Sequence, residues 1–343
     1  MTLDDRKARV LRAVVEEHIE TGLPVGSRVI AKRYPLGVSP ATIRNEMAEL
    51  EETGYLDKPH TSSGRVPSDR GYRFYVDQLM PIPRLSDEEL SALESLFRSR
   101  AKDVVSLLKE TVRILSDSTN YLGFVLGPES GEVSFSSIHL LPASGTKALL
   151  VIITDVGYVE TCLVDAPNMT LGEMRYVSDM LTGNLAYVRL DEVADRAEAL
   201  LREEASRYSR IIDQAAAFLR SLVSEPDEDR LFVGGTANLL SQPEFRDVAR
   251  VKDLLSAIED EGVIQYVLTR EERRGDPVIS IGSESSMGAV SNLSMVYGKF
   301  TAGNSEGRIG LLGPRRMDYG RSVAIIRFCE RRLSESLSKA RGT

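Results

Sequence analysis

The sequence is poor in cysteine: its 343 residues include only Cys162 and Cys329. Two cysteines so far apart form no disulfide framework, no CxxC redox pair and no cysteine-based zinc site, so a reducing, cytoplasmic environment is expected. Long apolar runs are missing too. The longest, Ala148–Ile153, falls far short of the roughly 20 residues that span a bilayer. The charged N-terminus has no signal-peptide pattern, so no membrane partner is expected.

The common enzymatic motifs are also absent. There is no Walker loop, no GxGxxG and no HExxH, and the isolated His18, His60 and His139 do not have the spacing of a metal site. Residues 303–307 fit the GxSxG pattern, but a nucleophile elbow needs a helix directly after the serine and a histidine downstream. A strand is expected there, and every histidine lies upstream. We therefore predict a glycine-rich hairpin at 303–307, no catalytic residue, no cofactor and no metal.

The charge is distributed unevenly along the chain. Of the net charge of −8, residues 1–80 contribute nothing, with 12 Lys/Arg and 12 Asp/Glu, whereas residues 81–343 hold 31 and 39. Thr21–Asn45 contains four basic residues and no acid, and Lys58–Tyr75 adds four more against Asp69 alone. Locally concentrated basic charge favours contact with phosphates. The length and the 42% hydrophobic content indicate a globular chain of two or three domains.

The first 80 residues predict three helices, a β-hairpin and a further helix. The expected helices are 4–20, 27–33, 40–53 and 69–79, and the expected strands are 55–58 and 65–67 with a polar turn at 59–64. Ser39 is an N-cap, Pro40 takes the first helical position, and Gly54 closes the third helix. This order is typical of a winged helix-turn-helix DNA-binding domain.

The third helix carries the functional prediction. Ile43, Met47 and Leu50 are spaced four and three residues apart, so they share the face that points into the core. The opposite face then presents Ala41, Thr42, Arg44, Asn45 and Ala48. Arginine suits guanine, asparagine suits adenine, and methyl groups meet thymine, so we expect base contacts from Thr42, Arg44 and Asn45.

Neighbouring polar residues are expected to hold phosphates or to enter the adjacent groove, and the helix N-terminus adds donors and a positive dipole. The candidate DNA-binding residues are Ser27, Arg28, Ser39, Pro40, Thr42, Arg44, Asn45, His60, Thr61, Ser62 and Arg65. Two alternatives stay open. Three helices with a hairpin can also form a protein-binding or purely structural module, and His60 can serve the turn alone.

Beyond a stiff linker at 80–83, helices and strands alternate. Helical segments are predicted from 86 to about 118, and helices at 170–181, 191–224 and 317–338, with helical pieces near 238 and at 252–258. Strands are predicted at 133–141, 147–154, 158–164, 231–233, 263–268, 278–281, 289–300 and 308–312. Strands on both sides of a helical block suggest one α/β domain interrupted by an insertion.

Four runs near the N-terminus resemble the heat-inducible transcription repressor family, HrcA. They are Pro24–Arg28, Val38–Met47, Pro59–Pro67 and Gly71–Asp77, and shorter similar runs follow at 136–138, 234–240, 281–284 and 310–319. The resemblance implies a GAF-like domain interrupted by an inserted dimerisation domain. The expected division is a winged helix at 1–80, a linker at 81–86, GAF-like parts at 87–188 and 276–343, and the insertion at 189–275.

The resemblance also implies a function: a homodimeric repressor of heat-shock (chaperone) operons that the GroEL chaperonin keeps active. A symmetric dimer presents two recognition helices, so its operator should be an inverted repeat. One alternative is a metabolite-responsive winged-helix regulator that uses the GAF-like domain as a ligand pocket. A structural scaffold that never meets DNA is another.

Overall fold

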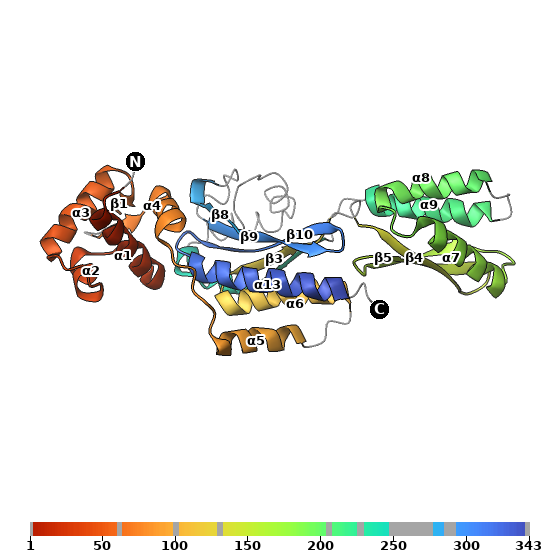
Figure 1. Ribbon diagram of the computed structural model, residues 1–343, viewed down its shortest axis with the longest axis horizontal. Coiled ribbons are helices and arrows are strands. Elements are labelled where there is room, and N and C mark those ends of the chain that lie inside the picture. The colour runs from red at the N-terminus through yellow and green to blue at the C-terminus, as the bar shows by residue number, and fades with distance from the viewer. Residues whose placement is uncertain are drawn as a thin grey trace.

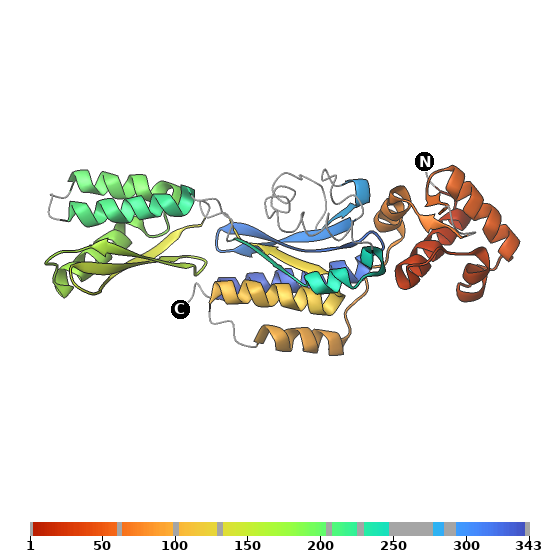
Figure 2. The same ribbon diagram turned by 180° about the vertical axis from the view of Figure 1, so that it is seen from behind.

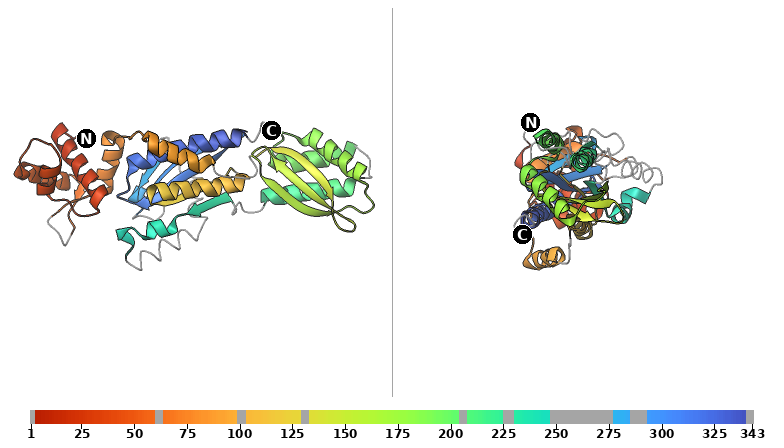
Figure 3. Two further views of the ribbon diagram at one scale, coloured as in Figure 1. Left: turned by 90° about the horizontal axis from the view of Figure 1, so that it is seen from below. Right: turned by 90° about the vertical axis from the view of Figure 1, so that its right-hand side faces the viewer.

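The computed structural model describes residues 3–59, 64–98, 103–128, 133–203, 208–224, 230–246, 277–284 and 293–339. Over these residues the chain mixes helices with three β-sheets, of two, five and three strands. Figure 1 shows them in a row, and Figure 3 shows the same order from below. We call the three parts the N-terminal unit (3–79), the central unit (the five-stranded sheet and its helices) and the distal unit (133–224).

The N-terminal unit forms as the sequence predicts. Its elements are α1 (Asp5–Thr21), α2 (Ser27–Arg33), α3 (Pro40–Glu52), β1 (Leu56–Asp57), β2 (Val66–Pro67), α4 (Asp69–Phe74) and a π-helical turn η1 (Tyr75–Leu79). Asp4 and Ser39 cap α1 and α3 by accepting backbone N–H bonds, and Gly22 ends α1 with a φ of 67°. The helix expected at 69–79 is therefore continuous, but its last five residues are wound as a π-helix.

The central unit is a five-stranded antiparallel sheet in the order β7-β3-β10-β9-β8. Its strands are β3 (Leu122–Leu126), β7 (Leu231–Gly234), β8 (Val278–Ile281), β9 (Leu293–Ala302) and β10 (Ser305–Pro314). Its helices are α5 (Asp87–Arg98), α6 (Val104–Thr119), α10 (Thr236–Leu240), η4 (Pro243–Arg246), η5 (Gly282–Glu284) and α13 (Tyr319–Lys339). Figures 1 and 2 show α6 and α13 covering one face of the sheet, with α5 outside them.

No strand was predicted at 122–126, although β3 lies inside the sheet between β7 and β10. All five of its residues are buried, so the alternation of polar and apolar residues that marks a half-exposed strand is absent. Gly123 lies against α6, where a Cβ atom would come within 2.7 Å of the Val112 carbonyl oxygen. The strand therefore depends on close packing between distant segments, which a local pattern does not record.

The predicted hairpin at 303–307 is confirmed. Ser305 begins β10 opposite Ala302 of β9, and Gly303 turns the chain with a φ of 64°. The serine is followed by a strand and is itself buried. This geometry differs from that of a nucleophile elbow, in which a helix follows the serine.

The distal unit is a three-stranded antiparallel sheet, β4-β5-β6, with three helices. Its elements are β4 (Phe135–Pro142), β5 (Lys147–Thr154), β6 (Val159–Asp165), α7 (Leu171–Leu185), α8 (Leu190–Glu203) and α9 (Ser209–Ser224). Helix α7, predicted at 170–181, starts with a capping box between Thr170 and Glu173. Along β5 buried residues alternate with half-buried ones, because helices cover only one face of this sheet.

Two expectations about this region need correction. The single helix predicted over 191–224 is wrong, because α8 and α9 are separate helices that pack against each other. Their apolar faces, with Ala197 on one and Leu219 on the other, are buried, whereas one straight helix of that length would leave much of its apolar face in water.

The sheet pairing also differs from the expected domain division. Among the described strands, β4–β6 pair only with one another, so they form one sheet with α7–α9 although they were expected to share a domain with the rest of 87–188. Strand β7, expected in the insertion at 189–275, pairs with β3 of the central sheet. The segment inserted into the central sheet, which includes the distal unit, thus lies between β3 and β7 in the sequence. The elements predicted at 252–258 and 263–268 and the residues 289–292 lie outside the described residues.

Candidate nucleic-acid interface

Helix α3 has the two faces that its sequence predicts. Ile43, Met47 and Leu50 are buried. The opposite side exposes Ser39, Pro40, Ala41, Arg44 and Asn45, with Thr42 half-buried beside them, and we call these six residues the exposed α3 face. The Ser39 and Thr42 hydroxyls lie 3.0 Å apart and share a hydrogen bond. The N-terminal half of this helix therefore offers amide, guanidinium, hydroxyl and methyl groups to a partner.

The base of the hairpin is fixed beside α2 by backbone contacts. Val25, just before α2, and Arg65, just before β2, exchange two hydrogen bonds of 2.8 and 2.9 Å. Gly64 makes this approach possible, because a Cβ atom there would lie 2.8 Å from the Pro24 carbonyl carbon. The Nε atom of Arg65 also donates to Glu51 of α3 over 2.6 Å. The hairpin and α3 thus form one surface.

Three cations of this unit are neutralised by neighbouring acids. Arg33 donates to Glu17 and Glu20, which joins α2 to α1 and raises the pKa of Arg33. Lys7 contacts Asp4, Glu46 and Glu49, and these acids raise its pKa. Arg65 is paired with Glu51. Glu46 is buried against α1, where it meets Arg6 and Lys7.

Four other cations make neither an ion pair nor a side-chain hydrogen bond with any residue that the structure describes, namely Arg28, Lys32, Arg44 and Lys58. All four are exposed. The acids of α1 and α3 are largely engaged with Lys7, Arg33 and Arg65, so the charge left at the exposed surface around α2 and α3 is mainly positive. A surface of this kind attracts phosphate.

The expected phosphate-holding residues do not all lie at this surface. Arg28 and Ser39 are exposed, but Ser27 is only 8% exposed and packs in the core of the unit. Arg65 is half-buried against Glu51. His60, Thr61 and Ser62 lie outside the described residues. The structure thus brings together the α2 and α3 candidates with the base of the hairpin.

The same described ranges contain no group of three or more His, Cys, Asp or Glu side chains arranged to hold a metal ion. None of their helices combines the length and apolar character needed to cross a bilayer. His18 packs near Tyr72, and His139 contacts Ser137 on a strand, so the two lie in separate units.

Comparison with known proteins extends this picture over the whole chain. Residues 105–323 match the family described as HrcA protein C terminal domain. A heat-inducible transcription repressor HrcA from Symbiobacterium thermophilum is 40% identical over 335 residues, which are 97% of this chain and 98% of the relative. The chain belongs to the HrcA family.

A second HrcA repressor, from Pelotomaculum thermopropionicum, is 38% identical over 346 residues, covering 100% of this chain and 99% of the relative. HrcA proteins are named as transcription repressors, which is not an enzyme class. A solved structure described as a hypothetical protein shares the fold, with a TM-score of 0.69 and 24% identity over 98% of this chain and 99% of that chain.

Residues at the boundary between the N-terminal and central units were not predicted from the sequence. The sequence predicts a strand up to 312 and a helix from 317, and Asp318 does accept a hydrogen bond from the Arg321 backbone N–H at the start of that helix. Arg315 and Arg316, just before that helix, also reach the N-terminal unit. Two adjacent arginines beside a helix start were the available signal, but their partners in the N-terminal unit, Asp69 and Ile19, lie more than 200 residues away along the sequence.

Proposed function

We propose that this chain represses transcription of heat-shock operons by binding an inverted-repeat operator with its N-terminal unit, used as a winged helix-turn-helix. The exposed α3 face carries the proposal. Its guanidinium and amide groups stand free at the N-terminal half of a helix, beside unpaired cations and without a free acid between them. Such a helix end is suited to the major groove.

Each residue of this surface has a proposed role. Arg44, Asn45 and Thr42 contact base edges. Arg28, Ser39 and the N-terminus of α3 at Pro40 contact phosphates, and the hairpin, with residues 60–62 and Arg65, follows the neighbouring groove. Arg65 acts first through Glu51, because that ion pair holds the hairpin against α3.

We further propose that the distal unit is the dimerisation domain and the central unit the GAF-like domain. Strand register aligns Leu141, Leu149 and Leu163 across the three-stranded sheet, and places Ile153 beside Val159. The apolar residues of the open sheet face are Leu141, Leu149, Val151, Ile153, Val159 and Leu163, and the register places Ser137, His139 and Thr161 on the same face. Leu141, Val159 and Leu163 are 48%, 57% and 59% exposed. A largely apolar face of this kind favours a partner, and a second copy supplies a matching one.

Two parts of the proposal rest on the family alone. The GroEL chaperonin keeps the repressor active, and heat relieves repression because unfolded proteins then occupy the chaperonin. The protein acts in the cytoplasm, where the operator lies.

The test is a footprint on the chain's own genomic upstream regions of chaperone operons, with and without GroEL. We expect protection of an inverted repeat, extended by GroEL and weakened by Arg44→Ala. Arg113→Ala, which removes an exposed arginine from α6, is the matched control. Absence of protection at low salt, or equal binding by the Arg44→Ala and unaltered chains, would refute the proposal. Release of the operator by a metabolite would favour the ligand-regulated alternative.

A further inference from the structure

The N-terminal unit is attached to the central unit by more than its linker. Residues from α1 and α4 meet η5, the end of β8 and the segment between β10 and α13. We call this contact the junction. It comprises Ile19, Asp69, Tyr72 and Arg73 on one side and Ile279, Ser283, Glu284, Arg315, Arg316 and Tyr319 on the other.

Two polar clusters cross the junction. Arg73 donates to Glu284 over 2.7 Å through Nε and, through Nη2, to the Ile279 carbonyl oxygen over 2.7 Å. Asp69 accepts from Arg315 over 2.8 Å and from the backbone N–H and hydroxyl of Ser283 over 3.0 and 2.7 Å. Each cluster holds a charged group from two or more directions. Contacts of this geometry fix an orientation as well as a distance.

The centre of the junction is aromatic and closely fitted. Tyr72 is 2% exposed and meets Tyr319 edge to face, with ring centroids 6.0 Å apart. Arg316 donates to the Ile19 carbonyl oxygen while Glu244 holds its other side. Gly282 adopts a φ of 52°, and a Cβ atom there would lie 2.6 Å from the Asp69 carboxylate oxygens. The backbone is therefore shaped around Asp69.

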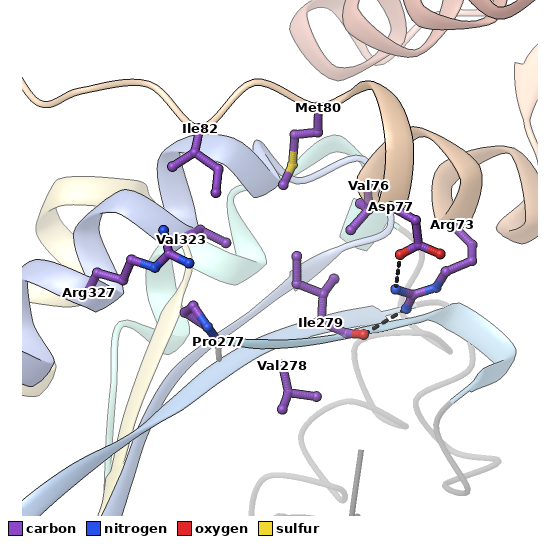
Figure 4. Close-up of a pocket in the computed structure, with 10 residues that line it drawn as sticks. All are labelled: Arg73, Val76, Asp77, Met80, Ile82, Pro277, Val278, Ile279, Val323 and Arg327. Atoms are coloured by element: carbon purple, nitrogen blue, oxygen red, sulfur yellow. Dashed lines mark hydrogen bonds and ion pairs between the residues drawn. The ribbon is translucent and has the colours of Figure 1, made fainter. Parts of the chain in front are cut away.

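Beside these contacts the two units leave a gap. Figure 4 shows an open cavity of about 380 Å³ between Val76, Met80 and Ile82 on one side and Val323 and Arg327 on the other. The cavity thus interrupts the packing on this side of the boundary, while Tyr72 and Tyr319 join the apolar cores of the two units beside it. The two polar clusters and the tyrosine pair therefore hold the orientation of the N-terminal unit.

The two surfaces proposed to bind partners belong to units at opposite ends of the molecule (Figures 1 and 2). The exposed α3 face is in the N-terminal unit, and the open sheet face is in the distal unit. A small rotation at the junction would displace α3 strongly relative to the dimer axis. Recognition helices of a dimer fit half-sites only when these are separated by about one helical turn, 10–10.5 base pairs, or its multiples.

We propose that the junction determines which half-site spacing the dimer accepts. Asp69, Arg73, Glu284 and Arg315 are then specificity-determining positioning residues that do not touch DNA. This inference rests on the proposed operator binding, but its physical basis, a fixed orientation between two units, can be measured without DNA.

The first measurement uses spin labels at Glu52→Cys in α3 and Val105→Cys in α6, with Cys162→Ser to remove the half-buried native thiol. Cys329 is fully buried, and burial raises the pKa of its thiol, so it stays unlabelled. Dilution with unlabelled chain limits the signal to one protomer. We expect one narrow distance distribution, and at least a doubling of its width in the Asp69→Ala/Glu284→Ala variant.

The second measurement uses the inverted repeat found by footprinting, with 0 or about 5 base pairs inserted between its half-sites, since 5 base pairs rotate one half-site by half a turn. The unaltered chain should bind the original spacing at least about tenfold more tightly, and the double variant at most about threefold more tightly. A duplex with one half-site should bind both chains equally, which shows that the variant's N-terminal unit is folded.

Matched variants separate the junction from a general loss of charge. Lys299→Ala removes a 2.6 Å ion pair with Glu306 on the β9–β10 hairpin, far from the junction, and should behave as the unaltered chain. Arg73→Glu should broaden the distances, and adding Glu284→Arg should narrow them again.

The outcomes distinguish the two hypotheses. An unchanged distance distribution in the double variant overturns the inference, whatever the DNA result. Broadened distances with an unchanged spacing preference overturn it too. Failure of the unaltered chain to bind any operator refutes the proposed function, while the label distances still report whether the junction is rigid.

Discussion

The exposed α3 face and the open sheet face are both without a partner in the single chain, but their chemistry is opposite. The first presents Arg44 and Asn45 with unpaired cations nearby. The second presents leucine, valine and isoleucine side chains in register over three strands. Water solvates a guanidinium well and an apolar sheet poorly. The exposed α3 face is therefore stable in water and suits a transient partner, whereas the open sheet face favours a permanent interface.

Because of this difference, we expect the largest effect on dimerisation and operator binding from a charge placed on the open sheet face. Leu163→Lys should convert the dimer to a monomer, because an unpaired charge buried in an apolar interface costs about 3–5 kcal/mol. Operator affinity should fall by at least about 100-fold, since each monomer holds one half-site. Sedimentation and gel shifts measure the two effects.

Thr301→Lys is the control, because it places a lysine on an exposed strand position of the central sheet. It should leave both the mass and the operator affinity unchanged. A Leu163→Lys chain that sediments as a dimer would show that the open sheet face is not the dimer interface.

A substitution on the exposed α3 face is expected to have a smaller and more sequence-selective effect on operator binding. Arg44→Ala should cost about 1–3 kcal/mol of operator binding and relax discrimination at one base pair, while the chain remains dimeric. Competition against single-base operator variants measures it. A uniform loss over all competitors would show instead that Arg44 contacts the phosphate backbone.

The exposed α3 face was also the part of the molecule that the sequence predicted best. The cap at Ser39 and the spacing of Ile43, Met47 and Leu50 are local features, and each acts within one or two helical turns. Helix boundaries and the exposed face of α3 follow from them directly. The same local information could not place Glu46, whose burial depends on Arg6 and Lys7 of another helix.

The central and distal units were predicted less well because pairing decides them. The five apolar residues of β3 fit a strand only beside β7 and β10, and the 191–224 segment divides because α8 and α9 bury each other. Tertiary contacts of this kind outweigh local propensity. The junction is an extreme case, since Arg73 and Glu284 are 211 residues apart along the chain.

The arginines of the N-terminal unit allow a finer test of the polar surface. Arg28→Ala should lower the slope of log affinity against log salt by about 0.9, as expected for one lost phosphate contact. Arg65→Ala should weaken all sequences alike but leave this slope unchanged, because Glu51 already neutralises Arg65 and its role is to hold the hairpin. If Arg65→Ala lowers the slope as much as Arg28→Ala, Arg65 leaves Glu51 and binds phosphate in the complex.

The smallest expected effect lies at His18, which packs beside Tyr72 of the junction. Burial lowers the pKa of His18 below its ordinary value of 6.5, and the nearby Arg316 and Arg315 lower it further, although Leu23 and Glu244 act in the opposite direction. The folded chain therefore disfavours the protonated ring. This contribution to stability is complete above pH 6.5 and is lost as the pH falls from 6.5 through the folded-state pKa.

Thermal unfolding between pH 7.5 and 5.5 should show a decrease in Tm. His18→Gln, which keeps a donor for the Leu23 carbonyl oxygen, should make that decrease shallower. An equally steep decrease in the variant would assign it to other groups and leave the junction insensitive to pH in this range.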